Sequence, residues 1–323
     1  MGRIEPSVSV VIPTFNRPHL VAWAVRSALT QTLGAIEVIV VVDGPDEATS
    51  EVLRQIHDSR LIIKVLPGNL GLAGALNAGV NQARTRWVAF LDDDDEWFPH
   101  KLELQLHTAR QSRHPYPIIS CRLIDRSETG GSIWPRRFPN PNEPISEYLF
   151  CRKSPFWGEG LIQTSTIFTT KELLKRVTFK NGLRRHVDID WLLRASTFGG
   201  VGVEFVPGPE PLLVWHTEGN RNRISNSTDW RYSLSWIQAN GHLFTPRARM
   251  SAIMTWVSEK AAREGDLNAF PLLLQEAYRS GKLTIGDTLL YLGIWLIPRG
   301  LRRRIEFVRR RRNSVVKLGL PRK

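Results

Sequence analysis

Residues 37–47 read EVIVVVDGPDE, and this stretch sets the pattern of the first half of the chain. The run 38–42 is apolar and β-branched throughout, which is typical of a strand that is buried on both faces of a parallel sheet. Asp43, Gly44 and Pro45 then end the strand with a turn. This stretch therefore predicts an α/β domain whose sheet is covered by helices on both faces.

The neighbouring sequence repeats the same alternation. Expected strands and helices follow one another as strand 7–12, helix 18–30, strand 37–42, helix 48–56, strand 61–66, helix 70–83, strand 87–91 and helix 100–110. Parallel strands place their carboxyl ends at one edge of the sheet, which is where ligands bind. Polar residues follow three of these strands, at 14–17, at Asp43 and at 92–95. We predict that they meet at the ligand-binding edge.

The second half of the chain has a weaker pattern. We expect strands at 118–124, 161–169 and 210–216, a long loop at 127–142 and a helix at 188–197. Beyond residue 225 only helical periodicity remains, at 230–239, 248–262, 267–280 and 285–312. We therefore predict an α/β domain over 1–225 and a helical C-terminal region with a basic tail over 226–323.

The composition is that of a folded protein with an excess of basic charge. The 323 residues carry a formal net charge of +13, with 42% hydrophobic and 23% charged residues. Two cysteines, Cys121 and Cys151, form neither a disulfide framework nor a metal-binding pattern, which favours free thiols in a reducing compartment. The first fifteen residues lack a charged segment followed by a long apolar one, so we expect a cytoplasmic protein without a signal peptide.

Much of the basic charge follows an apolar segment near the C-terminus. Residues 288–297 read TLLYLGIWLI, and residues 299–323 are rich in arginine. The apolar segment is shorter than the roughly 20 residues that span a bilayer. An apolar segment beside a basic cluster can instead lie on an anionic membrane surface. We expect this peripheral association with the inner face of a membrane rather than nucleic-acid binding, because no interleaved aromatic residues or nucleic-acid module accompany the arginines.

Residues 90–97 read FLDDDDEW and place four carboxylates directly after an expected buried strand. Carboxylate oxygens are hard ligands that suit Mg²⁺ or Mn²⁺, and such an ion can hold a diphosphate. The alternative is a solvated acidic turn that caps the next helix. The apolar strand before the run and the sequence EWFPHKLELQ after it favour a metal site.

Three ordered segments resemble a known family. The sequences VSVVIPTFNRPHLVAWAVRSALTQT, EVIVVVDGPDE and NLGLAGALNAGVNQARTRWVAFLDDDDEWFPHKLELQ look like glycosyltransferase family 2, whose members are inverting enzymes of GT-A fold. The resemblance is dense over residues 7–110 and looser to about 220. It implies a Rossmann-like, mixed and mostly parallel sheet flanked by helices. It also implies a nucleotide-sugar donor, a divalent cation held by a D-x-D motif, and inversion at the anomeric carbon.

The resemblance assigns donor-binding roles residue by residue. Asp43 stands where the family has an acid that accepts a hydrogen bond from the base imide, which would favour uracil or thymine. Its alternative role is in the Asp-Gly-Pro turn. Gly71 is expected near the diphosphate and sugar, whereas Gly74, Ala75 and Gly79 are expected to pack the helix on the sheet. The remaining expected donor-binding residues are Pro13, Thr14, Asn16 and Arg17, in the loop beside the nucleobase and ribose, and Asn77, near the diphosphate and sugar.

The same resemblance implies a separate role for each residue of the acidic run and a catalytic base elsewhere in the chain. The D-x-D motif falls on Asp92 and Asp94, with Asp95 as a further candidate for metal contact. Asp93 takes the variable position and is expected to face solvent, although we count it with the donor-binding residues. In RRHVDIDWLLRAS (184–196) Asp188 takes the position of the catalytic base. Asp190 is the alternative base, and an acid that only stabilises the helix N-terminus is the structural alternative.

Val187 departs from the family, since many members have Glu there. His216 is expected to complete the metal shell or touch the diphosphate, although a lone histidine on a strand is often structural. Arg221 and Arg223 could clamp phosphates, with a solvated basic loop as the alternative. Trp157 and Glu159 could line an acceptor pocket or pack in the core.

We therefore interpret the chain as a metal-dependent inverting glycosyltransferase that uses Mn²⁺ or Mg²⁺. Its expected partners are a UDP- or dTDP-sugar and a glycan or lipid-linked acceptor, as in cell-surface polysaccharide synthesis. A polyprenyl-phosphate sugar synthase is a related alternative. A non-catalytic GT-A-like binding protein is an alternative from another class. A nucleotidyltransferase is disfavoured because the loop 13–17 is too short for its Gly-rich phosphate loop.

Overall fold

The computed structural model describes residues 5–127, 130–152, 158–217, 229–281, 283–297 and 301. Contacts divide the chain into two compact units. The first unit comprises Met1–Ser127, Ile133–Phe138 and Ile162–Ser225, and the second comprises Glu128–Ser132, Pro139–Leu161 and Asn226–Lys323. The sequence did not lead us to expect that 139–161 belongs with the C-terminal helices. The division into domains at residue 225 stays a prediction.

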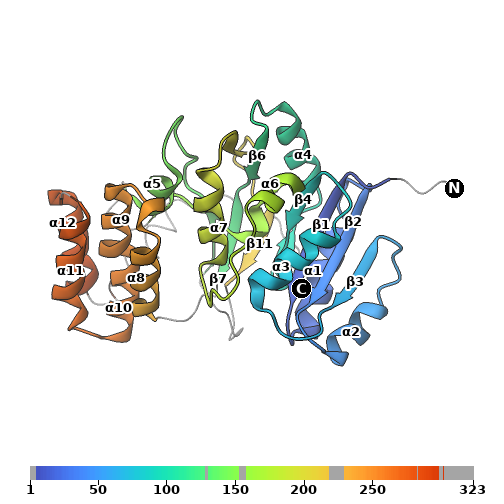
Figure 1. Ribbon diagram of the computed structural model, residues 1–323, viewed down its shortest axis with the longest axis horizontal. Helices are drawn as coiled ribbons and strands as arrows, with labels where there is room; N and C mark the ends of the chain where they lie inside the picture. The colour runs from blue at the N-terminus through green and yellow to red at the C-terminus, as the bar shows by residue number, and fades with distance from the viewer. Residues whose placement is uncertain are drawn as a thin grey trace. The chain divides into compact units, whose positions relative to one another are not determined.

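A seven-stranded sheet forms the centre of the first unit (Figure 1). Its strands lie in the order β10-β6-β9-β4-β1-β2-β3. β9 is antiparallel to its neighbours β4 and β6, whereas the other pairs are parallel. The mixed and mostly parallel sheet confirms the predicted α/β class. The bounds are β1 (Val8–Thr14), β2 (Ile36–Val42), β3 (Leu61–Val65), β4 (Trp87–Phe90), β6 (Tyr116–Ser120), β9 (Phe168–Thr170) and β10 (Val201–Phe205).

The strand β1 is longer than the sequence indicates. We expected it to end at Ile12, but it continues through Pro13, which pairs with Val41 of β2. The backbone N–H of Leu91 donates to the carbonyl of Val11 on the β4 side of the strand. Pro13, two residues further on, has its backbone on that same side, just beyond the point where β4 ends. The missing N–H of proline therefore interrupts no ladder bond.

Helices pack closely against the main sheet. α1 contacts β1 and α2, whereas α3 contacts β1, β2 and α6. A Cβ on Gly79 of α3 would lie 2.3 Å from Cγ1 of Val11, so only glycine permits this approach to the sheet. The packing role predicted for Gly79 is confirmed. The helices of this unit are α1 (Pro18–Leu29), α2 (Glu47–Arg54), α3 (Gly71–Gln82), α4 (Lys101–Gln111), α6 (Lys171–Arg176) and α7 (Val187–Ser196).

A smaller sheet takes its strands in the order β5-β11-β7-β8. The single strand that we predicted at 118–124 is wrong, because the chain leaves the main sheet after Ser120 and enters the smaller one at Leu123. Remote backbone contacts fix this break, since Val206 donates to the carbonyl of Ser120 and Leu212 donates to that of Arg122. The predicted loop at 127–142 also contains β8. The bounds are β5 (Glu96–Trp97), β7 (Leu123–Ser127), β8 (Gly130–Trp134) and β11 (Leu213–His216).

The second unit is helical in its described C-terminal part, as predicted. Among the described residues, no helix combines the length and apolar character that crossing a membrane requires. The predicted helix 285–312 is described as α12 up to Leu296, and its later residues lie largely outside the described part. The helices are α5 (Ile145–Phe150), α8 (Trp230–Ala239), α9 (Pro246–Ser251), the π-helical turn η4 (Ala252–Val257), α10 (Ser258–Glu264), α11 (Ala269–Ser280) and α12 (Ile285–Leu296).

Candidate active site

Three strand ends bring the predicted polar segments to one edge of the main sheet. Thr14, the last residue of β1, pairs with Val42, and the next residue, Asp43, donates its backbone N–H to the carbonyl of Thr14 at 2.9 Å. On the other side of β1, Phe90 of β4 pairs with Val11, and the acidic run starts two residues later at Asp92. The carboxyl ends of β4, β1 and β2 therefore meet as the sequence predicts.

Asp93 points into the protein rather than to solvent. It is only 5% exposed. Thr14 Oγ1 donates to its Oδ2 at 2.8 Å, and Arg17 Nη1 donates to its Oδ1 at 2.9 Å. Burial raises the pKa of Asp93 to about 6, although Arg17 opposes this shift. The expectation of a solvent-facing side chain is thus wrong, because the loop after β1 supplies two donors that hold this carboxylate inward.

Asp92 and Asp94 lie among like charges. Arg17 Nη1 is 3.6 Å from Oδ2 of Asp94, whose side chain is 11% exposed. Burial raises the pKa of Asp92 well above its usual range, and the charges of Asp95, Asp94 and Asp188 raise it further. Crowded carboxylates of this kind are relieved by a cation.

Asp95 lies on the other side of the run and is only 2% exposed. Its Oδ2 accepts hydrogen bonds from Gln163 Nε2 at 3.0 Å and from Ser165 Oγ at 2.6 Å. Neither Gln163 nor Ser165 was predicted to belong to the site, because the Thr- and Ile-rich stretch around them has the composition of a strand. The structure instead has the 3₁₀ turn η1 (Thr164–Thr166) there, which β9 follows.

The acidic run fits a divalent cation that is shared with a substrate. The described residues contain no group of three or more His, Cys, Asp or Glu side chains arranged to hold a metal. Mg²⁺ and similar ions are, however, commonly bound by one or two carboxylates together with substrate phosphates, without a full protein cage. Asp92 and Asp94 at the sheet edge match this donor set, and they could hold the ion once a diphosphate is present.

His216, the fourth predicted metal ligand, has another described neighbour. It ends β11, which pairs with β5, and its Nε2 lies 3.6 Å from Oε2 of Glu96. Its contact with a metal or diphosphate stays a prediction.

Asp43 helps to form the start of α3. Its Oδ1 accepts the backbone N–H of Leu70 at 2.7 Å, and the residue is 4% exposed. Gly71 follows with φ +75°, a conformation that side chains rarely adopt, so glycine is needed at this turn. The predicted contacts of Asp43 with a base and of Gly71 with a diphosphate stay predictions.

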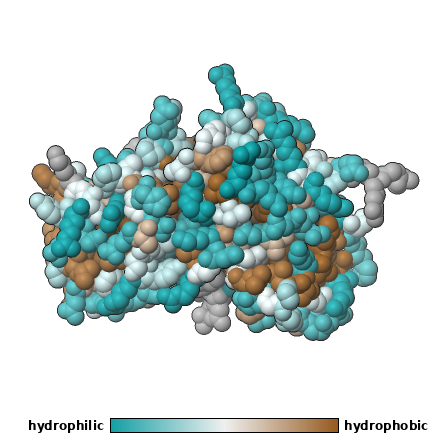
Figure 2. All heavy atoms as spheres, viewed as in Figure 1, coloured by the Kyte–Doolittle hydropathy of each residue, from teal (hydrophilic) through white to brown (hydrophobic). Residues whose placement is uncertain are grey.

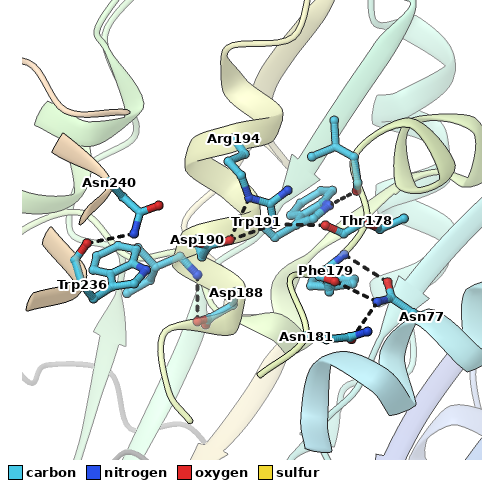
Figure 3. A network of polar contacts seen from close by, with 12 residues as sticks. Asn77, Thr178, Phe179, Asn181, Asp188, Asp190, Trp191, Arg194, Trp236 and Asn240 are labelled. Carbon is cyan, nitrogen blue, oxygen red and sulfur yellow. Dashed lines mark hydrogen bonds and ion pairs between the residues drawn. The ribbon is translucent and has the colours of Figure 1, made fainter. Parts of the chain in front are cut away.

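Asn77 of α3 binds the segment that precedes α7 (Figure 3). Its Nδ2 donates to the carbonyl of Phe179 at 2.8 Å, and its Oδ1 accepts the backbone N–H of Phe179 at 3.0 Å. The side-chain amide of Asn77 therefore links α3 to the backbone at Phe179. The predicted role of Asn77 in donor binding stays a prediction.

Asp188 lies at the start of α7. Its Oδ1 accepts the backbone N–H of Ile189 at 2.8 Å. Burial raises the pKa of Asp188, against the effect of backbone N–H groups at Ile189 and Thr164. The charge of Asp188 in turn contributes to the raised pKa of Asp92. The predicted base therefore interacts electrostatically with the predicted metal-binding run.

Asp190 is buried and forms an ion pair with Arg194 (Figure 3). It is 0% exposed, and its Oδ2 lies 2.8 Å from both Nε and Nη2 of Arg194. Arg194 also donates to the carbonyl of Thr178 at 3.0 Å. A base must reach an acceptor hydroxyl, so these contacts favour Asp188 over Asp190.

Four further predictions concern residues outside the site described above. Trp157, Arg221 and Arg223 lie outside the described residues. Glu159 belongs to the second compact unit, which is described separately.

Solved structures share the fold. A Staphylococcus aureus TarS fragment (residues 1–349) in complex with UDP-GlcNAc matches with a TM-score of 0.56, at 16% identity, over 87% of this chain and 95% of that chain. The mannosyltransferase PcManGT from Pyrobaculum calidifontis, in complex with GDP-Man and Mn²⁺, matches with a TM-score of 0.54, at 17% identity, over 94% of this chain and 87% of that chain. These likenesses and the central sheet show the GT-A fold that the sequence predicts.

Sequence comparison identifies the family. The family model described as "Glycosyl transferase family 2" matches residues 9–180. The amylovoran biosynthesis glycosyltransferase AmsB from Erwinia amylovora is 31% identical over 242 residues, which are 72% of this chain and 77% of AmsB. The glucosyltransferase WfgD from Escherichia coli is 34% identical over 126 residues, 39% of this chain and 50% of WfgD. The chain belongs to glycosyl transferase family 2, which confirms the resemblance.

Proposed function

We propose that this glycosyltransferase is an inverting enzyme that transfers a sugar from a nucleotide-diphospho-sugar to an acceptor hydroxyl in cell-surface polysaccharide synthesis. One observation carries the proposal: the carboxyl ends of β4, β1 and β2 bring the acidic run, Thr14 and Asp43 to one edge of the main sheet. Asp188, whose charge contributes to the raised pKa of Asp92, is the proposed base at this edge. An inverting transfer requires such a base on the acceptor side.

We assign separate roles in the transfer reaction to the residues at this edge of the main sheet. Asp188 accepts the proton of the acceptor hydroxyl as that oxygen attacks the anomeric carbon, and its raised pKa suits a proton acceptor. Asp92 and Asp94 would hold a divalent cation, Mn²⁺ or Mg²⁺, which would supply positive charge to stabilise the departing diphosphate. Arg17, paired with Asp93, fixes the loop after β1 beside these carboxylates.

The donor is best assigned to the UDP or dTDP class. Asp43 is an acceptor-only carboxylate at the end of β2, which suits the imide N–H of uracil or thymine. The name of WfgD specifies UDP-Glc. The acceptor class is supported by names as well: AmsB belongs to amylovoran biosynthesis, and WfgD acts on a diphosphoundecaprenol-linked sugar.

A donor screen tests the proposed activity. We expect nucleoside diphosphate to be released from UDP- or dTDP-sugars, and more slowly from GDP-sugars, when Mn²⁺ and a lipid-linked glycan acceptor are present. Calorimetric titration of the full chain with UDP should show binding that strengthens in Mn²⁺ relative to EDTA. Equal and negligible heats in the two conditions would contradict the enzyme assignment and favour a non-catalytic binding protein.

The helix α12 supports a location at an anionic membrane surface. Ile285, Leu289 and Leu296 are 82%, 64% and 72% exposed, and their spacing of four and seven residues places them on one helix face. Figure 2 shows brown hydrophobic atoms among hydrophilic ones where α11 and α12 lie. The arginine-rich sequence 299–323 follows directly. An apolar face next to basic charge favours peripheral binding to anionic lipid.

Vesicle binding tests this location. The full chain should sediment with phosphatidylglycerol-containing vesicles but not with pure phosphatidylcholine vesicles. Leu289→Asp should weaken that binding roughly tenfold or more, because it replaces an apolar side chain that would contact the lipid by a charged one. Leu104→Asp, at the exposed position Leu104 of α4, is the matched control and should bind as wild type. Unchanged binding of Leu289→Asp would contradict the membrane role of this face. A wild-type dimer in light scattering that Leu289→Asp converts to a monomer would also contradict it, because this face would then be a contact between copies of the chain.

A further inference from the structure

Residues 163–166, which we name the 163–166 turn, form a buried and self-capped unit. The Oε1 of Gln163 accepts the backbone N–H of Ser165 at 2.7 Å. In return, Thr166 Oγ1 accepts the backbone N–H of Gln163 at 3.2 Å, which completes a capping box. None of the four residues is more than 8% exposed. The turn therefore has a single, well-determined conformation.

Neighbouring elements hold this turn from several sides. Gln105 of α4 donates to the carbonyl of Thr166 at 2.8 Å, and Ser120 of β6 donates to Oγ1 of Thr166 at 3.0 Å. Trp97 donates its indole N–H to the carbonyl of Ser165 at 3.1 Å. β9 follows at Phe168 and pairs with both β4 and β6. The turn is thus fixed to the central sheet.

The side chains of the turn form hydrogen bonds with two residues of the acidic run, Asp92 and Asp95. Ser165 Oγ donates its one hydrogen to Oδ2 of Asp95 at 2.6 Å and accepts the backbone N–H of Asp92 at 3.0 Å. Gln163 Nε2 donates to the same oxygen of Asp95 at 3.0 Å. A single buried hydroxyl therefore ties the first and last residues of the run Asp92–Asp95 to one point.

The turn also has an electrostatic effect on the predicted base. The backbone N–H of Thr164 lowers the pKa of Asp188 and so opposes the effect of burial on that carboxyl group. Residues 163 and 165 are the members of the turn that contact the run that would hold the cation.

We propose that the 163–166 turn sets the position of the acidic run for cation binding, with Ser165 and Gln163 as positioning residues. This inference rests on the proposed function. Misplacement of a reacting group by about 1 Å can cost on the order of 10²-fold in rate. Loss of a partner that orients a metal ligand typically costs about 10–100-fold in metal affinity or activity.

Ser165→Ala removes both hydrogen bonds of the hydroxyl and tests the inference. In calorimetry with UDP, we expect the Mn²⁺ concentration for half-maximal binding to rise about 10–100-fold. Binding of UDP in EDTA should not change. In transfer assays kcat should fall more than KM for the donor rises, because ground-state contacts to the nucleoside remain. Ser165→Thr keeps a hydroxyl and should recover most of the Mn²⁺ dependence.

Ser120→Ala is the matched control, since Ser120 is a 0% exposed serine that donates to the same turn but does not contact the acidic run. Both alanine variants should lose similar thermal stability, and only Ser165→Ala should lose Mn²⁺ affinity. Gln163→Glu, which keeps the capping acceptor but places a second carboxylate against Asp95, provides an independent variant with the same expected loss.

Equal effects of Ser165→Ala and Ser120→Ala on Mn²⁺ affinity would overturn the positioning role and leave the turn as a structural support. Wild-type Mn²⁺ dependence in both Ser165→Ala and Gln163→Glu would also overturn it. Failure of the proposed function is distinguishable, because in that case the wild-type chain itself would show no Mn²⁺-dependent binding of UDP.

Discussion

Asp188→Asn should reduce sugar transfer by about 10³-fold or more while leaving Mn²⁺-dependent UDP binding close to that of the wild type. Asparagine has the shape of aspartate and can still accept the backbone N–H of Ile189, which now binds Oδ1 at 2.8 Å. It cannot take a proton from the acceptor hydroxyl. The measurement pairs single-turnover transfer rates with calorimetry of UDP in Mn²⁺, so that chemistry and binding are read separately.

Asp190→Asn is the control for a general effect on α7. Because Asp190 is fully buried against Arg194, its loss should lower the unfolding temperature, and the folded variant should keep more activity than Asp188→Asn. Retained transfer in Asp188→Asn would contradict the role of Asp188 as base. That result would favour transfer to a phosphate acceptor, as in a polyprenyl-phosphate sugar synthase, since a phosphate oxygen needs no strong base.

The central sheet could be predicted because its strands carry their own signal. β1 and β2 are buried at every position, and buried parallel strands are continuous apolar runs that can be recognised without their neighbours. The same property located the site, since Thr14, Asp43 and Asp92 each follow such a run. Topology alone then brings them to one edge.

The features that the sequence did not predict depend on contacts between remote segments. The break between β6 and β7 is fixed by backbone donors at Val206 and Leu212, about ninety residues away. The inward turn of Asp93 depends on Thr14 and Arg17, which no local pattern around residue 93 reveals. Ser165 was missed for a similar reason: its stretch has strand composition, and only its hydrogen bonds to Asp92 and Asp95 mark it as part of the site.

Asp94→Ala should abolish Mn²⁺-dependent UDP binding with little effect on stability. The Asp94 carboxylate lies at the sheet edge, where Arg17 Nη1 is 3.6 Å from it and 2.9 Å from Asp93. Removing it leaves the Arg17–Asp93 pair in place and removes one of the charges that raise the pKa of Asp92, so Asp94→Ala should destabilise the fold less than Asp93→Ala. Calorimetry with UDP in Mn²⁺ and in EDTA measures the loss, and chemical denaturation measures the stability.

Asp93→Ala should show the opposite pattern, and the contrast decides which carboxylates serve the cation. This change leaves Thr14 and Arg17 without their buried acceptor, which should lower the free energy of unfolding by about 1–3 kcal/mol. Folded Asp93→Ala protein should still bind UDP more tightly in Mn²⁺ than in EDTA, because Asp92 and Asp94 remain. If Asp93→Ala lost this dependence at full stability while Asp94→Ala kept it, the cation would have to be reassigned to Asp93. The hydrogen bonds from Thr14 and Arg17 argue against that outcome, since they hold both oxygens of Asp93 inward against the loop after β1.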